Sequence, residues 1–215
     1  MVYSSTGKYI INPDEKRVID SGTYGTIYEY DKDTCFKVFK HQGIHKPDPI
    51  ITLKELSLKN FYKIYDLLYD YNLEYTGYIM QYYKQEDFNI LSDRDYLLDS
   101  VNGIYDGIME LTRRMIQVVD LHEANIIVNK DGMTVIDIDN FKKFNGDNTY
   151  INIFRYKEVL KVLLYRYLKY YKPKHPMAAY LLIKRLVDEN SSDLTIFNDI
   201  MKGFQKPIDY FNKVL

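Results

Sequence analysis

The spacing of apolar residues changes once along this chain, between residues 81 and 86, and this change constrains the fold more than any other feature. Before it, short apolar runs alternate with polar turns, a pattern typical of antiparallel strands. After it, apolar residues recur every three or four positions, a pattern typical of helices packed on a core. We therefore expect an α+β protein with a β-rich part over residues 1–83 and a mainly helical part over residues 84–215.

Strands and one helix are expected in the first part. The strands are expected at residues 17–20, 26–30, 35–40, 61–72 and 75–83. Residues 48–60 predict a helix that Asp48 caps, with Pro49 at the first helical position, where its missing N–H is not needed. Because Glu55 falls on the same predicted face as Ile51 and Leu58, its carboxylate is expected to need a partner of opposite charge.

The second part carries two apolar stripes at helical spacing. The first consists of Leu97, Val101, Ile104, Ile108, Leu111 and Met115. Arg113 and Arg114 lie in its last turn, where cations suit the helix dipole, whereas Gly103 and Gly107 lower the helix propensity. The second stripe begins at Tyr156 and predicts a helix that ends at Pro173. Between them, residues 125–138 predict a short hairpin.

Composition excludes several classes of protein. The 29 basic and 30 acidic residues give a net charge of −1, so no basic excess points to a nucleic acid. The single cysteine, Cys35, cannot form an internal disulfide, and we expect a reducing, cytoplasmic setting. No apolar run is long enough to span a bilayer, and the N-terminus lacks the apolar core of a signal peptide.

Two polar features of the first part are compatible with anion binding. The turn "DSGTYGTI" (residues 20–27) contains Gly22 and Gly25, so its backbone N–H groups can approach a bulky anion, although an ordinary hairpin turn would also have this sequence. Lys37 lies in the middle of a predicted strand, on the same face as two apolar neighbours. Glu55 on the predicted helix would supply the opposite charge that Lys37 needs.

The stretch "VVDLHEANIIV" (residues 118–128) places a carboxylate and a carboxamide on one loop between two apolar segments. Asp120 can accept a proton from a hydroxyl group, and the amide oxygen of Asn125 can bind Mg²⁺. Asp137, at the end of the hairpin's return strand, would place a second oxygen ligand beside Asn125. Each of these residues alone would more often serve a turn or a cap, but their order and spacing favour a shared site.

Taken in chain order, these motifs of residues 18–141 resemble the protein-kinase-like fold in its small bacterial form. The resemblance implies two lobes, a small β-rich lobe and a reduced helical lobe. The resemblance implies that Gly22, Thr23 and Gly25 cover the phosphates of ATP. It implies that Lys37 pairs with the α- and β-phosphates, braced by Glu55, with Lys40 as a weaker alternative. The segment "YIMQYY" resembles the connection between lobes, with Met80 as gatekeeper and the backbone of Gln81 and Tyr83 binding adenine.

The resemblance also implies roles for the second part. Asp120 corresponds to the base, Asn125 and Asp137 to the Mg²⁺ ligands, and His122 to the residue near the γ-phosphate. Asp139 is an alternative metal ligand. The form D-L-H-x-x-N also resembles relatives that phosphorylate aminoglycosides or choline.

Two departures from the resemblance limit what it implies. Val118 and Val119 replace the His-Arg pair before the base, and no Ala-Pro-Glu motif follows the metal motif. We expect an ATP-dependent phosphotransferase that uses Mg²⁺ and modifies a Ser or Thr hydroxyl of a protein. The alternatives are a small-molecule kinase and a pseudokinase that serves as a scaffold. A basic helix at residues 155–175 could also contact an anionic membrane, although a core helix with a solvated basic face explains the same pattern.

Overall fold

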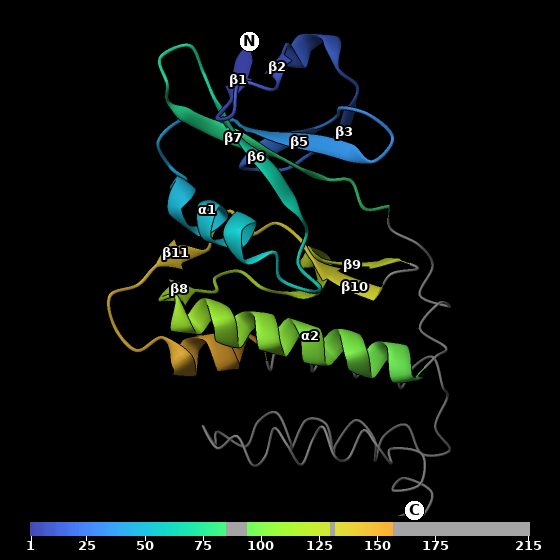
Figure 1. The fold of residues 1–215 in the computed structure, drawn as a ribbon, viewed down its shortest axis with the longest axis vertical. Coiled ribbons are helices and arrows are strands. Elements are labelled where there is room, and N and C mark those ends of the chain that lie inside the picture. The colour runs from blue at the N-terminus through green and yellow to red at the C-terminus, as the bar shows by residue number, and fades with distance from the viewer. Residues whose placement is uncertain (85–93, 130–131, 157–215) are drawn as a thin grey trace, which may run out of the picture.

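The computed structural model describes residues 1–84, 94–129 and 132–156. The largest sheet in this part of the chain has seven antiparallel strands (Figure 1). The spatial order is β2-β1-β6-β7-β5-β4-β3. The strands are β1 (Val2–Ser4), β2 (Ile10–Ile11), β3 (Val18–Ser21), β4 (Gly25–Glu29), β5 (Thr34–Phe39), β6 (Ile64–Tyr69) and β7 (Tyr75–Gln81). The five predicted strands of the first part are confirmed, and β1 and β2 add two short strands that the sequence did not indicate.

Strand β5 lies between β4 and β7, so Lys37 stands inside the sheet rather than at an edge. Its register partners are Ile27 on β4 and Tyr78 on β7. Gly77 on β7 permits this pairing, because a Cβ there would lie 1.9 Å from the carbonyl oxygen of Lys37. The sheet thus fixes the backbone on both sides of the lysine.

Helix α1 (Pro47–Leu56) forms where a helix was predicted, but its cap and its buried face are different. Lys46 is the N-cap and makes no side-chain cap hydrogen bond, so the predicted cap by Asp48 is wrong. The helix buries Ile50 and Leu53, and Glu55 is exposed. Two residues correspond to about 200° around a helix axis, so burial of Leu53 turns Glu55 toward solvent.

Helix α2 (Arg94–Arg113) lies on the other side of α1 from the sheet (Figure 1) and confirms the first predicted stripe over its second half. Ile104, Ile108 and Leu111 are fully buried. Met115 is exposed, with φ of 58°, just beyond the end of the helix, so its place in the stripe is wrong. The side chains of Leu97 and Val101 lie outside the description.

Two small antiparallel sheets lie beside α2. One is the predicted hairpin, β9 (Ile126–Asn129) and β10 (Gly132–Val135); the other pairs β8 (Ile116–Gln117) with β11 (Lys142–Lys143). A further helix begins at residue 149 and is described to residue 156, so the predicted stripe from Tyr156 and the basic segment 155–175 fall almost entirely outside the described residues. No described helix is long and apolar enough to cross a membrane.

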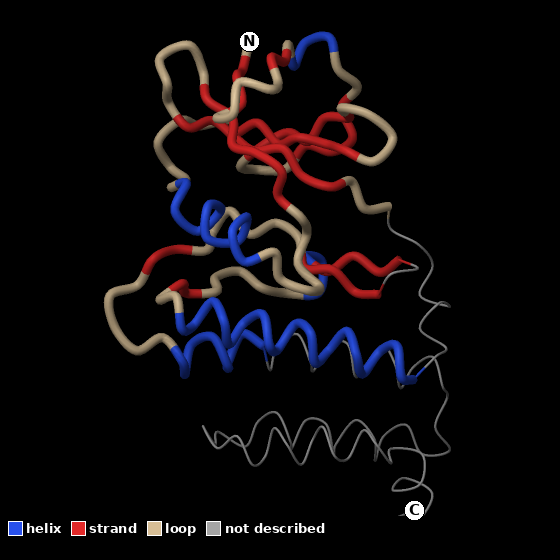
Figure 2. The backbone as a smooth tube through the Cα atoms, in the orientation of Figure 1, coloured by secondary structure: helices blue, strands red, loops and turns tan. Residues whose placement is uncertain are grey.

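One hydrophobic cluster joins these parts. It contains Phe39 and Tyr78 of the large sheet, Leu53 of α1, Ile104 of α2 and Val135 of β10. Figure 2 shows the strands of the large sheet gathered at one end of the described chain, with α1 and α2 beneath them. A smaller cluster contains Phe36 and Leu68 together with Val2 of β1 and Ile11 of β2. The predicted boundary between the two parts of the chain, at residues 83 and 84, lies just after the end of β7. This boundary and the two-lobed arrangement both stay predictions.

Candidate active site

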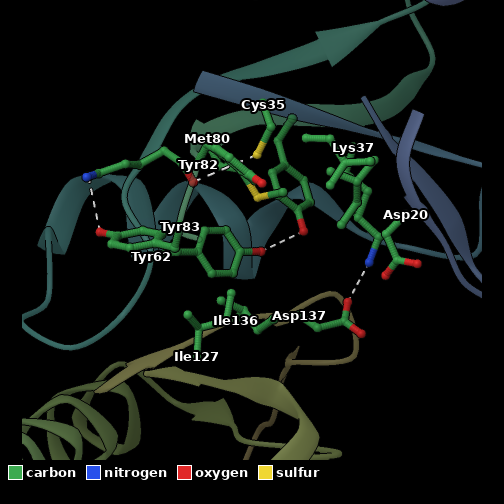
Figure 3. A pocket seen from close by; sticks show the side chains of 14 residues that line it. Asp20, Cys35, Lys37, Tyr62, Met80, Tyr82, Tyr83, Ile127, Ile136 and Asp137 are labelled. Atoms are coloured by element: carbon green, nitrogen blue, oxygen red, sulfur yellow. Dashed lines mark hydrogen bonds and ion pairs between the residues drawn. The ribbon is translucent and has the colours of Figure 1, made fainter. Parts of the chain in front are cut away.

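A cavity of about 160 Å³ lies between the large sheet and the hairpin β9–β10. Its walls are largely apolar, and Lys37, Asp137 and Asp20 also line it. Figure 3 shows the ammonium group of Lys37 facing the carboxylate of Asp137. Met80, the predicted gatekeeper, lines the same cavity, and so do Gln81 and Tyr83, whose backbone was predicted to bind adenine. The cavity therefore combines apolar walls with a charged pair.

Lys37 is almost completely buried, with 6% of its surface exposed, and it makes ion pairs with two carboxylates. Its Nζ contacts Oδ1 of Asp137 and Oδ2 of Asp139. Burial lowers the pKa of Lys37, but the negative charges of Asp139 and Asp137 outweigh burial, and the net pKa is raised. The lysine thus keeps its charge inside the protein.

Asp139 is the more deeply buried of the two carboxylates. Its side chain is 1% exposed, and Tyr78 Oη donates a hydrogen bond of 2.6 Å to its Oδ1. Tyr62 Oη in turn donates to Tyr78 Oη at 2.6 Å. Burial raises the pKa of Asp139, and the positive charge of Lys37 opposes this shift without cancelling it. A nitrogen of the His45 ring lies 3.1 Å from the backbone oxygen of Asp139.

The loop after β8 presents Asp120 to solvent. Its side chain is 49% exposed, and its backbone has φ of 60°, in the left-handed region. Asn140 Nδ2 donates to Asp120 Oδ2 at 3.1 Å, and Asn125 Nδ2 donates to the Asp120 carbonyl oxygen at 2.9 Å. His122 Nε2 lies 3.7 Å from Asp120 Oδ1. These contacts hold the loop, and the side chain of Asp120 stays half exposed to solvent.

Asn125 and Asp137 lie at the same end of the hairpin. The Ile136 N–H donates to the Asn125 carbonyl oxygen at 2.8 Å, directly beyond the last register pair of β9 and β10. Among the described residues, no group of three or more His, Cys, Asp or Glu side chains could hold a metal ion. Mg²⁺ is commonly bound by one or two protein side chains together with substrate phosphates. The carboxylate of Asp137 is 41% exposed and lines the cavity, so it can reach a cation there, whereas Asn125 is 7% exposed and lies outside the cavity lining.

The glycine-containing turn joins β3 to β4. Gly22 N–H donates to the Gly25 carbonyl oxygen at 3.0 Å, and Lys40 Nζ donates to the Gly22 carbonyl oxygen at 2.7 Å. Lys40 therefore contacts this turn, whereas Lys37 occupies the buried position. Asp20 lines the cavity, while Gly22, Thr23 and Gly25 lie outside its lining.

The structure does not bring Glu55 to Lys37. Glu55 is exposed, and the ion pairs that Lys37 makes with described residues are those with Asp137 and Asp139, so the expected Lys37–Glu55 pair is wrong. Sequence reasoning considered Asp139 as an alternative metal ligand and missed its contact with Lys37. The two-residue spacing of Asp137 and Asp139 in "IDID" could have indicated this contact, because it permits both carboxylates to approach one cation.

The chain matches no protein-family model, and a search of curated proteins also finds no match. Among solved structures it is similar to the Legionella pneumophila kinase Lpg2603 bound to IP6, with a TM-score of 0.51 and 17% sequence identity. The match covers 70% of this chain and 61% of that kinase. The fold is therefore kinase-like, as the sequence resemblance implies, and at this identity the likeness shows the fold alone.

Proposed function

We propose that this chain is an ATP-dependent phosphotransferase whose acceptor is a Ser or Thr hydroxyl of a protein. The observation that carries the proposal is the meeting of Lys37 and Asp137 in a cavity with otherwise largely apolar walls. Such walls suit an adenine ring, with Gln81 and Tyr83 beside it, and the ammonium of Lys37 suits phosphate oxygens. The kinase-like fold supports this assignment.

Asn125 and Asp120 also have roles in the proposed reaction, together with Asp137. Asn125 and Asp137 would hold Mg²⁺, which neutralises phosphate charge when it is bound. Asp120 would accept a hydrogen bond from the acceptor hydroxyl and hold it in line, because its exposed carboxylate can be reached from solvent. Most of the rate gain would come from position and charge stabilisation.

Two other functions have a specific observation in their favour. The D-L-H-x-x-N form of residues 120–125 favours a small-molecule acceptor, such as an amino alcohol or a sugar. The exposure of Glu55, away from Lys37, favours a pseudokinase scaffold, because the usual brace of the lysine is absent. Retention of Lys37, Asp120 and Asp137 argues for an active enzyme.

Incubation of the full chain with labelled ATP and Mg²⁺ tests the proposal. Separate reactions contain a generic protein substrate or a panel of sugars and amino alcohols, each with and without IP6, since the similar kinase was solved with IP6 bound. We expect label on Ser or Thr, and we expect Asp120→Asn to lower the rate at least about 100-fold. Asp106→Asn, at an exposed position of α2, serves as the matched control. If Asp120→Asn labels as much substrate as the wild type, Asp120 is not the base.

A further inference from the structure

We propose that Asp139, and not Glu55, is the residue that positions Lys37 for the phosphates of the nucleotide. This inference rests on the proposed function and adds a positioning residue to it. Lys37 touches two carboxylates, and their surroundings differ enough to assign them different roles.

Asp137 is available to a ligand. Its side chain is 41% exposed and lines the cavity, so a cation bound there can reach its oxygens. A carboxylate that binds such a cation has less negative charge left for Lys37. Asp137 is therefore poorly suited to fix the lysine in the state that binds nucleotide.

Asp139 is not available to a ligand. Its side chain is 1% exposed and is absent from the cavity lining. The hydrogen bond from Tyr78 holds Oδ1, which leaves Oδ2 for Lys37. Tyr62, which donates to Tyr78, extends this chain of contacts into the core. A buried carboxylate needs a charged or hydrogen-bonding partner, and here Lys37 and Tyr78 supply both.

The backbone of the same segments keeps the pair together. Lys37 and Tyr78 are register partners on β5 and β7, so the sheet that fixes the lysine also fixes the hydroxyl that orients Asp139. Glu55 lies on the solvent side of α1 and takes no part in this arrangement. Asp139 thus performs the bracing that the sequence resemblance assigned to Glu55.

A double-mutant cycle on unfolding tests the pair without any nucleotide. The variants are Lys37→Met, Asp139→Asn and their combination, with Lys37→Met and Glu55→Gln as the comparison cycle. We expect the first cycle to show a coupling of about tenfold in the unfolding equilibrium constant, because residues in contact couple. The comparison cycle is expected to show none. Coupling of Lys37 to Glu55 instead of Asp139 overturns the proposal.

Nucleotide binding then separates a positioning role from a purely structural one. Binding of a non-hydrolysable ATP analogue and of adenosine is measured by calorimetry. We expect Asp139→Asn to lower the affinity for the ATP analogue by about 10-fold to 100-fold. The affinity for adenosine should not change, because Lys37 contacts only the phosphates. Glu55→Gln is expected to keep wild-type affinity for both. Equal weakening of both ligands by Asp139→Asn would mean that Asp139 merely supports the fold, and the proposal would be wrong.

Two provisions keep the test decisive. If Asp139→Asn does not fold, Tyr78→Phe removes the hydrogen bond that orients Asp139, and the same loss confined to the ATP analogue is expected at smaller size. If the wild type binds neither ligand, the proposed function fails, and the unfolding cycle alone then decides whether Asp139 holds Lys37.

Discussion

At the residue scale, two buried carboxylates show how neighbouring groups decide the pKa of an acid. Asp139 has one cation and one hydroxyl as partners, and burial keeps its pKa raised. Asp66 on β6 is equally inaccessible, but its oxygens accept hydrogen bonds from Ser5, Thr6 and Lys54. Burial raises the pKa of Asp66, but these hydrogen bonds together outweigh burial and lower it. Asp66 therefore ties the β1–β2 turn and α1 to the sheet more strongly when it is ionised than when it is protonated.

Asp66→Asn should change the acid stability of the protein. Because the folded pKa is depressed, the stabilisation is fully present above the unfolded pKa of about 3.9 and is lost progressively as pH falls from there through the lower folded pKa. We expect Asp66→Asn to lower the free energy of unfolding by about 1.5–3 kcal/mol at neutral pH, the range for hydrogen bonds to charged groups. The difference in the free energy of unfolding between the variant and the wild type should be smaller in acid. Urea unfolding at pH 7 and pH 3 measures it, with the exposed Asp14→Asn as control. A deficit of equal size at both pH values would contradict this origin.

The residues of the site differ in how far sequence could place them. The positions of Lys37 and Asp137 could be predicted, because Lys37 lies within a predicted strand and Asp137 at the end of one. The alternation of side chains along a strand depends only on local sequence. Glu55 could not, because a shift of one residue in the buried face of a helix turns a side chain by about 100°. The bracing contact of Asp139 depends on Tyr78, which comes from an element about 60 residues earlier and is brought there only by sheet pairing.

At the element scale, the two glycines of α2 are explained by packing rather than by helix propensity. Gly103 and Gly107 lie four residues apart and so share one face of the helix. A Cβ at Gly103 would lie 1.9 Å from Asn60 Oδ1, and a Cβ at Gly107 would lie 2.3 Å from Cε2 of Phe61. The loop at Asn60 also pairs with β10, since the Val135 N–H donates to the Asn60 carbonyl oxygen at 2.7 Å. The glycines let α2 approach the loop between α1 and β6, which contacts the hairpin.

Gly107→Ala should therefore destabilise the protein although alanine favours helix by about 1 kcal/mol. The added methyl group must displace the Phe61 ring, and overpacking of this kind costs about 1–3 kcal/mol. We expect a lower midpoint in chemical unfolding. Asn102→Ala, at an exposed position of the same helix, should be neutral or stabilising. If Gly107→Ala raises the midpoint as Asn102→Ala does, the close approach to Phe61 is not limiting.

The elements that sequence missed are the shortest ones. β2, β8 and β11 have two residues each, too few for any period to be visible. Each is defined by the strand it pairs with, β2 by β1 and β11 by β8. Such pairing is a tertiary property, and it follows from the packing of longer elements that the apolar pattern does predict.

At the scale of the whole molecule, the cavity lies between segments that share one hydrophobic cluster. Residues of the large sheet, α1, α2 and the hairpin all belong to that cluster, so we expect them to lose structure together. The cavity is lined from both sides, by Lys37 and Met80 of the sheet and by Ile127 and Asp137 of the hairpin region. A ligand in this cavity would contact both sides and stabilise the shared core as a unit.

Thermal unfolding with Mg-ATP distinguishes nucleotide use from the scaffold alternative. A ligand at 100 times its dissociation constant adds about 2.7 kcal/mol, which for a chain of this size corresponds to a rise in Tm of roughly 5–10 °C. We expect such a rise for the wild type, and we expect Asp137→Ala to abolish it, because Asp137 is the proposed metal ligand that faces the cavity. Mg²⁺ without nucleotide, and the exposed Asp147→Asn variant with Mg-ATP, serve as controls. A wild-type Tm that does not change at millimolar Mg-ATP would favour a scaffold, since a folded protein that binds a ligand must be stabilised by it.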